Sequence, residues 1–203
     1  MRRNAYDRFL ASMNIGYEQW HDGVGYDLDA LDRMSPRERE SAEAVLVARA
    51  ESDWRDLEAL DRLGTPRAHD AILRARSAHD LQIRLCAHRY GPTASPREWE
   101  AVIVDGLAVR DNITTLVSAL TAATEFASPP VVRALWREVR TANNTSAFHC
   151  AAALCTIAGR TASVYDNGYR DLCLRMHGPQ TPARDAAILE LESLCAGTPA
   201  EPV

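Results

Sequence analysis

The sequence predicts an all-α protein built from antiparallel helix pairs. Three observations support this fold class. Ser-Pro or Thr-Pro dipeptides recur as helix starts, a second series of polar capping residues lies between them, and strand patterns are nearly absent. The first four Ser/Thr-Pro starts are 30, 30 and 33 residues apart, which is the spacing of a helical repeat.

The first series of starts combines a capping side chain with proline. The Ser or Thr oxygen can accept a bond from an N–H of the first turn, and proline at the first helical position loses no donor that the helix would use. Glu38 and Glu98 follow two of these serines by three residues, which predicts two capping boxes. The five starts are Ser35-Pro36, Thr65-Pro66, Ser95-Pro96, Ser128-Pro129 and Thr181-Pro182.

A second series of polar residues predicts one further helix within each period. Its members are Ser52-Asp53, His79-Asp80, Asp111-Asn112 and Asn144-Thr145. In the turn between the two series, Gly64 suits the left-handed position after a helix, and Pro66 starts the next helix at once. Such short turns favour antiparallel packing of the two helices that they join.

The apolar periodicity and the caps together predict helices over 4–13, 28–33, 36–50, 53–63, 66–77, 80–90, 96–109, 112–126, 130–142, 145–158, 168–177 and 182–196. The run Ala101–Val104 resembles a buried strand but continues in helical register. Two loop-rich segments, 14–27 and 159–167, interrupt the pattern. We expect one structural domain, with a cap at 1–34, repeats at 35–196 and a disordered tail at 197–203.

Composition restricts the class of protein. The net charge is −5, which argues against the dense positive field that binding to a phosphate backbone uses, so a nucleic-acid partner is not favoured. Every basic side chain other than histidine is arginine. No apolar run has the length of a membrane span and no signal peptide is recognisable, so we expect a cytoplasmic protein. The five cysteines form no C-x-x-C pair, which favours buried thiols over a disulfide framework, a metal site or another cofactor.

The segment from Asp53 to Ala68, followed by an apolar helix and by a helix beginning at Asp80, resembles the HEAT repeat. The residues from Met13 to Leu31 are similar to the opening of a group of uncharacterised bacterial HEAT-like proteins. The resemblance implies a right-handed α-α superhelix of about four to five helix pairs, whose second helices line a concave side. It implies no activity.

The first cluster of candidate functional residues lies in the loop before residue 28. Adjacent His21 and Asp22 could act as an acid–base pair, and Trp20 and Tyr26 could contact a ligand. Alternatively, Trp20 and Tyr26 cover the apolar edge of the first repeat while Asp27 caps the following helix; we favour this second interpretation.

Further candidates lie on the predicted helices. Asp53 and Asp56 could be acid–base groups, and Trp54 and Arg55 could form a partner site, although a helix cap with a surface ion pair is the simpler interpretation. Arg84 and His88 share one helical face. The last cluster surrounds the second loop and contains His149, Tyr165, Asp166 and Tyr169.

Three functions remain open from the sequence. We favour a protein-binding scaffold or adaptor, which could be a bacterial assembly or immunity factor, because stacked helix pairs form extended binding surfaces. The first alternative is an enzyme acting on a small molecule through His21 and Asp22 at the concave face. The second is a nucleic-acid-binding protein, which requires a continuous arginine face from Arg55, Arg62, Arg67, Arg74, Arg84 and Arg89. The oligomeric state is left open.

Overall fold

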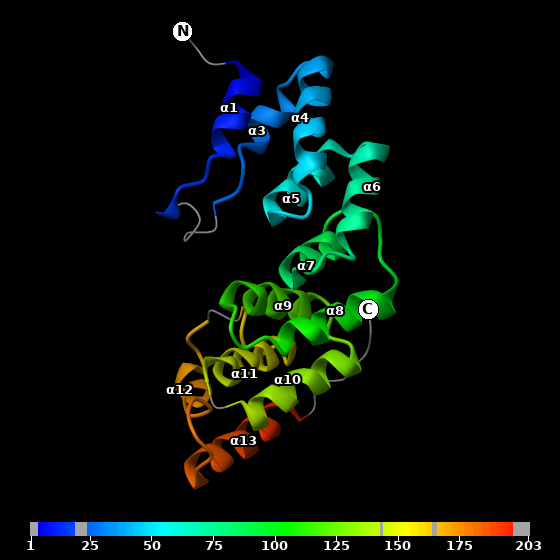
Figure 1. The fold of residues 1–203 in the computed structure, drawn as a ribbon. Helices are drawn as coiled ribbons and strands as arrows, with labels where there is room; N and C mark the ends of the chain where they lie inside the picture. The colour runs from blue at the N-terminus through cyan, green and yellow to red at the C-terminus, as the bar shows by residue number, and fades with distance from the viewer. Residues whose placement is uncertain (1–3, 19–23, 143, 164–165, 197–203) are drawn as a thin grey trace. The chain divides into compact units, whose positions relative to one another are not determined.

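A computed structural model describes residues 4–18, 24–142, 144–163 and 166–196 of the chain. Within these ranges every regular element is a helix, and twelve helices have defined bounds (Figure 1). The predicted all-α fold class is therefore confirmed. The chain divides into two compact units, Met1–Ala94 and Ser95–Val203.

The N-terminal unit stacks one helix pair on the next. Its helices are α1 (Ala5–Ser12), α3 (Leu28–Asp32), α4 (Pro36–Arg49), α5 (Trp54–Leu63), α6 (Pro66–Ala75) and α7 (Leu81–Arg89). α4 pairs with α5, and α6 pairs with α7. Across the two pairs, α4 contacts α6 and α5 contacts α7, so first helices meet first helices and second helices meet second helices. α1 and α3 pack together at the start, against α4 and α5 respectively.

The C-terminal unit repeats the same arrangement. Its helices are α8 (Pro96–Leu107), α9 (Ile113–Glu125), α10 (Pro129–Thr141), α11 (Thr145–Ile157), α12 (Arg170–Leu174) and α13 (Pro182–Cys195). α8 pairs with α9 and α10 with α11, while α8 contacts α10 and α9 contacts α11. The short helix α12 and the last helix α13 both pack against α11, as the ribbon shows (Figure 1).

The predicted helix starts are confirmed residue by residue. In all nine cases, from both series, the expected side chain accepts a hydrogen bond from the first turn; the residues are Ser35, Asp53, Thr65, Asp80, Ser95, Asn112, Ser128, Asn144 and Thr181. Both capping boxes are present. Gly64 has a φ of 64°, the left-handed conformation expected after α5. Each expected helix is found, with its ends within three residues of the predicted ones.

Burial explains why these helices pair. Leu46 of α4, Leu57 and Leu60 of α5, and Ile72 of α6 are all 0% exposed and belong to one apolar cluster of the N-terminal unit. Tyr26 joins this cluster, with its ring 6.0 Å from that of Phe9 in an edge-on arrangement. This burial agrees with the interpretation of Tyr26 as part of the cover of the first apolar edge.

The buried guanidinium of Arg184 binds α13, the last helix of the C-terminal unit, to the end of α10. Arg184, in the first turn of α13, is 2% exposed. Its guanidinium donates to the carbonyl oxygen of Val139 at 2.8 Å, to that of Gly178 at 2.6 Å, and to that of Ala142. Because Ala142 is the C-cap of α10, Arg184 neutralises the carbonyl end of that helix.

Candidate functional site

The buried carboxylate of Asp56 is the centre of a polar network in the N-terminal unit. Asp56 lies in the first turn of α5 and is 0% exposed. The hydroxyl of Tyr26 donates to its Oδ1 at 3.1 Å, and Nε of Arg49, at the end of α4, donates to its Oδ2 at 3.3 Å. The carboxylate is therefore held from two sides by segments that are distant in the sequence.

Burial dominates the electrostatics of this network. It raises the pKa of Asp56 to about 6, although the charge of Arg49 and the hydrogen bonds oppose the shift. Burial, followed by the charge of Asp56, also raises the pKa of Tyr26 well above its ordinary value. Tyr26 consequently stays a hydrogen-bond donor at any physiological pH.

Arg55 extends the network toward the preceding loop. Its Nε donates to the carbonyl oxygen of Val24 at 2.7 Å, and its Nη1 lies 3.2 Å from Oδ1 of Asp53. The guanidinium also lies 4.8 Å from the centre of the Trp54 ring. Arg55 is only 3% exposed, so the sequence-based interpretation of a surface ion pair at this position was wrong. The cap formed by Asp53 is confirmed.

The network brings together five predicted site residues and gives most of them a structural role. Tyr26 and Arg55 tie the chain before α3 to helix α5, and Asp53 and Asp56 receive their hydrogen bonds. Trp54 lies beside Arg55. Arg49 completes the arrangement, and its role was not anticipated because nothing in the local sequence pairs it with Asp56.

The other predicted residues lie apart from this network. Arg84 and His88 are one turn apart and half-buried on α7. Among the arginines that a nucleic-acid face would need, Arg55 is buried and Arg62 bonds to Asp32, with 3.0 Å between Nε and Oδ1. The remaining candidates Trp20, His21, Asp22 and Tyr165 lie outside the described residues.

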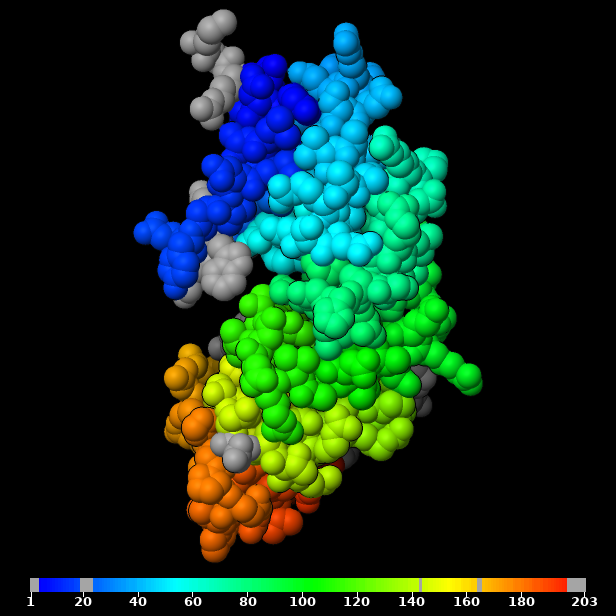
Figure 2. All heavy atoms as spheres, in the orientation of Figure 1, coloured from blue at the N-terminus to red at the C-terminus, as the bar shows by residue number. Residues whose placement is uncertain are grey.

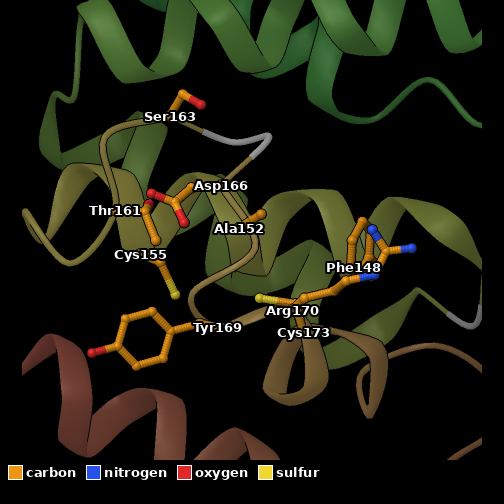
Figure 3. Close-up of a pocket in the computed structure, with 9 residues that line it drawn as sticks. All are labelled: Phe148, Ala152, Cys155, Thr161, Ser163, Asp166, Tyr169, Arg170 and Cys173. Atoms are coloured by element: carbon orange, nitrogen blue, oxygen red, sulfur yellow. The ribbon is translucent and has the colours of Figure 1, made fainter.

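A small hollow in the C-terminal unit gathers residues of α11, α12 and the loop between them (Figure 3). Its lining consists of Phe148, Ala152, Cys155, Thr161, Ser163, Asp166, Tyr169, Arg170 and Cys173. The empty volume of about 250 Å³ includes open solvent, and the cavity volume that a water molecule can occupy is only about 10 Å³, so the interior has room for about one water molecule.

Local hydrogen bonds shape the loop that borders the hollow. Asp166 accepts a bond from the N–H of Gly168 at 2.8 Å, and the hydroxyls of Thr156 and Thr161 lie 3.0 Å apart. The candidate Asp166 is thus part of the hollow. His149 lies next to it, with its ring 5.0 Å from that of Phe148, and burial lowers its pKa.

Two thiols meet in the hollow. Cys155 of α11 is 0% exposed and Cys173 of α12 is 2% exposed, and both side chains line the hollow. The interaction between the two thiols, together with burial, raises the pKa of Cys155, and the same interaction lowers the pKa of Cys173. Sequence reasoning missed this pair because its members lie on different helices with no recognisable spacing.

In residues 4–18, 24–142, 144–163 and 166–196, no three His, Cys, Asp or Glu side chains are placed to hold a metal ion. Over the same ranges, no helix combines the length and the apolar character that crossing a bilayer requires.

Comparisons with protein-family models, with curated proteins and with solved structures found no match to the chain. The fold itself therefore defines the class of protein. In both units, the described residues form an all-α protein of stacked helix pairs.

Proposed function

We propose that the protein is a HEAT-like scaffold or adaptor that binds a protein partner. The observation that carries the proposal is the stacking of first helices on first helices and second helices on second helices, which occurs in both units. Repeats stacked in this way form solenoids with extended concave binding surfaces. The superhelix that we propose is the right-handed one of HEAT-like repeats. An assembly factor or an immunity protein would be specific forms of this role.

The terminal helices α12 and α13 suggest where to test for partner binding. The last helices of a repeat array normally present a polar outer surface. Here Leu174 of α12 is 46% exposed and Leu189 of α13 is 65% exposed. An ion pair between Arg175 and Glu190 links the two helices next to these leucines. Both helices contribute to the surface of the C-terminal unit, where they are coloured orange to red (Figure 2).

The test is affinity purification from the native host, followed by reconstitution of the complex from purified proteins. We expect a stoichiometric protein partner whose affinity falls at least tenfold when Leu174 and Leu189 are both changed to serine. Leu73→Ser is the matched control, because Leu73 is 42% exposed on α6 of the other unit. Recovery of a monomer with a bound small molecule and no protein would contradict the proposal.

A further inference from the structure

The dipeptide Asn167-Gly168, in the loop before α12, is contacted by two charged side chains. The N–H of Gly168 donates to Oδ1 of Asp166 at 2.8 Å. The side-chain oxygen of Asn167 accepts a hydrogen bond from Nη1 of Arg170 at 3.3 Å. All four residues are exposed to solvent. A carboxylate therefore lies at the backbone nitrogen of Gly168, and a guanidinium lies at the side-chain carbonyl of Asn167.

We propose that Asn167 is a self-modification site, at which the chain converts the side-chain amide into a carboxyl group through a cyclic imide. The ring closes when the backbone nitrogen of Gly168 bonds to the side-chain carbonyl carbon of Asn167. Glycine places no side chain beside the attacking nitrogen, so it hinders this step least. No other asparagine of the sequence precedes a glycine; the others are Asn4, Asn14, Asn112, Asn143 and Asn144.

Asp166 and Arg170 contact the two groups that react. Asp166 already accepts the N–H of Gly168, so it is the base that removes this proton as the nitrogen attacks. The side-chain oxygen of Asn167 gains negative charge when its carbonyl carbon is attacked. Arg170 donates to that oxygen, so the guanidinium stabilises the charge as it develops. Both contacts therefore favour ring closure.

The reaction needs only water as a co-reactant and involves no oxidation. The proton of the Gly168 nitrogen moves to Asp166, a C–N bond to the side-chain carbon of Asn167 forms, and the bond to the side-chain nitrogen breaks. This nitrogen leaves as ammonia with the proton from Asp166. Water then adds to either carbonyl of the imide and opens the ring, so residue 167 becomes aspartate or isoaspartate. The net change is an amide and water giving a carboxylic acid and ammonia.

The loop fixes the reacting groups before the reaction begins. The carbonyl oxygen of Asn167 accepts the N–H of Arg170 at 3.2 Å, which closes a turn and brings the guanidinium to the amide. The second oxygen of Asp166 accepts the N–H of Ala162 at 3.4 Å, so the carboxylate is bound from both sides of the loop. A Cβ at Gly168 would lie 3.3 Å from Oδ1 of Asp166, a tight contact with the base. Because this positioning is absent from an unfolded chain, folding should accelerate the modification.

The product alters the border of the hollow in the C-terminal unit. Asp166 and Arg170 both line that hollow (Figure 3). A carboxylate at residue 167 accepts a stronger, charge-assisted hydrogen bond from Arg170 than the amide does. Isoaspartate also lengthens the main chain by one carbon atom. The modification therefore changes both the charge and the shape of this loop, and it is irreversible.

The experiment is peptide mapping of the full-length protein during incubation at neutral pH. Trypsin cuts after arginine, so Asn167 is the sole amide side chain of the peptide 161–170. Its deamidation is followed by mass, and incubation in ¹⁸O-labelled water should place one labelled oxygen at residue 167. The reference is a synthetic peptide of residues 159–172 in the same buffer. We expect the folded protein to react about tenfold faster than this peptide.

Variants test the two assigned roles. Asp166→Ala and Arg170→Met should each slow the folded protein to nearly the rate of the peptide with the same change. Arg170→Lys keeps a cationic donor and should retain most of the acceleration. Arg133→Met is the matched control, since Arg133 is an exposed arginine of α10 outside this loop, and it should leave the rate unchanged. Helical circular dichroism verifies the fold of each variant.

Three results would overturn the proposal. They are a folded protein that reacts no faster than the peptide, deamidation that occurs first at another asparagine, and rates that neither Asp166→Ala nor Arg170→Met lowers. Every readout is a mass of the chain itself, so the outcome is independent of the search for a protein partner.

Discussion

Replacing Asp56 by asparagine should change how the stability of the protein depends on pH. The carboxylate is fully buried, and its pKa is about 6 in the folded protein against an ordinary value of 3.8. The folded state therefore holds the proton more tightly than the unfolded state. The resulting stabilisation is complete below pH 3.8 and is lost as the pH rises through about 6. The difference between the two pKa values corresponds to about 3 kcal/mol.

Asparagine cannot ionise, so the variant lacks this contribution at every pH. The measurement is urea unfolding followed by far-ultraviolet circular dichroism, at a series of pH values on both sides of this range. The free energy of unfolding of the wild type minus that of Asp56→Asn should fall by about 3 kcal/mol as the pH rises from 3.8 to above 6. Other titrating groups cancel in the difference. Asp70→Asn, an exposed position on α6, is the control. A difference that is constant with pH would refute the reasoning.

Three further predictions concern the free energy of unfolding, measured in urea. Gly91 and Gly159 both have a positive φ, at which an alanine costs ~1–2 kcal/mol. Gly91→Ala should destabilise the protein by more than this, because the new Cβ would lie 2.8 Å from Ile72, whereas Gly159→Ala meets open space and should cost only the ~1–2 kcal/mol. Equal costs at the two positions would contradict this. Arg184→Met should destabilise by about 2 kcal/mol, since buried carbonyls lose their donor; an unchanged midpoint would contradict it. Ser128→Ala should cost about 1 kcal/mol through the lost α10 cap, whereas Ser128→Gly should restore most of it.

The helices were predictable because their signals are local. A capping side chain and the N–H that it accepts from are at most three residues apart, so the pattern at Ser35 or Ser95 contains the whole interaction. The same applies to Gly64, whose conformation depends on the turn itself. The alternation of the two cap series therefore predicted the order and approximate ends of the helices.

The sites were less predictable because their members meet only in the folded chain. Tyr26 and Asp56 are 30 residues apart and are joined through the packing of the N-terminal segment on α5. The charged residues around Arg55 are typical of a solvent-exposed helix start, but the guanidinium of Arg55 bonds to the backbone at Val24 and is buried there. Likewise, Cys155 and Cys173 each fit the pattern of a small buried apolar residue, and they line the same hollow only because α12 packs against α11.

Through Arg184, the docking of α13 depends on the full length of α10. Its guanidinium fits carbonyl groups at Val139 and Ala142, which exist in this arrangement only when α10 has completed its final turn. Fraying of that turn would remove two of the three carbonyl acceptors of a buried cation and leave only that of Gly178, so α13 should detach at the same time. The end of α10 and the docking of α13 should therefore open as one cooperative event, and their amide protons should exchange with solvent at matching rates.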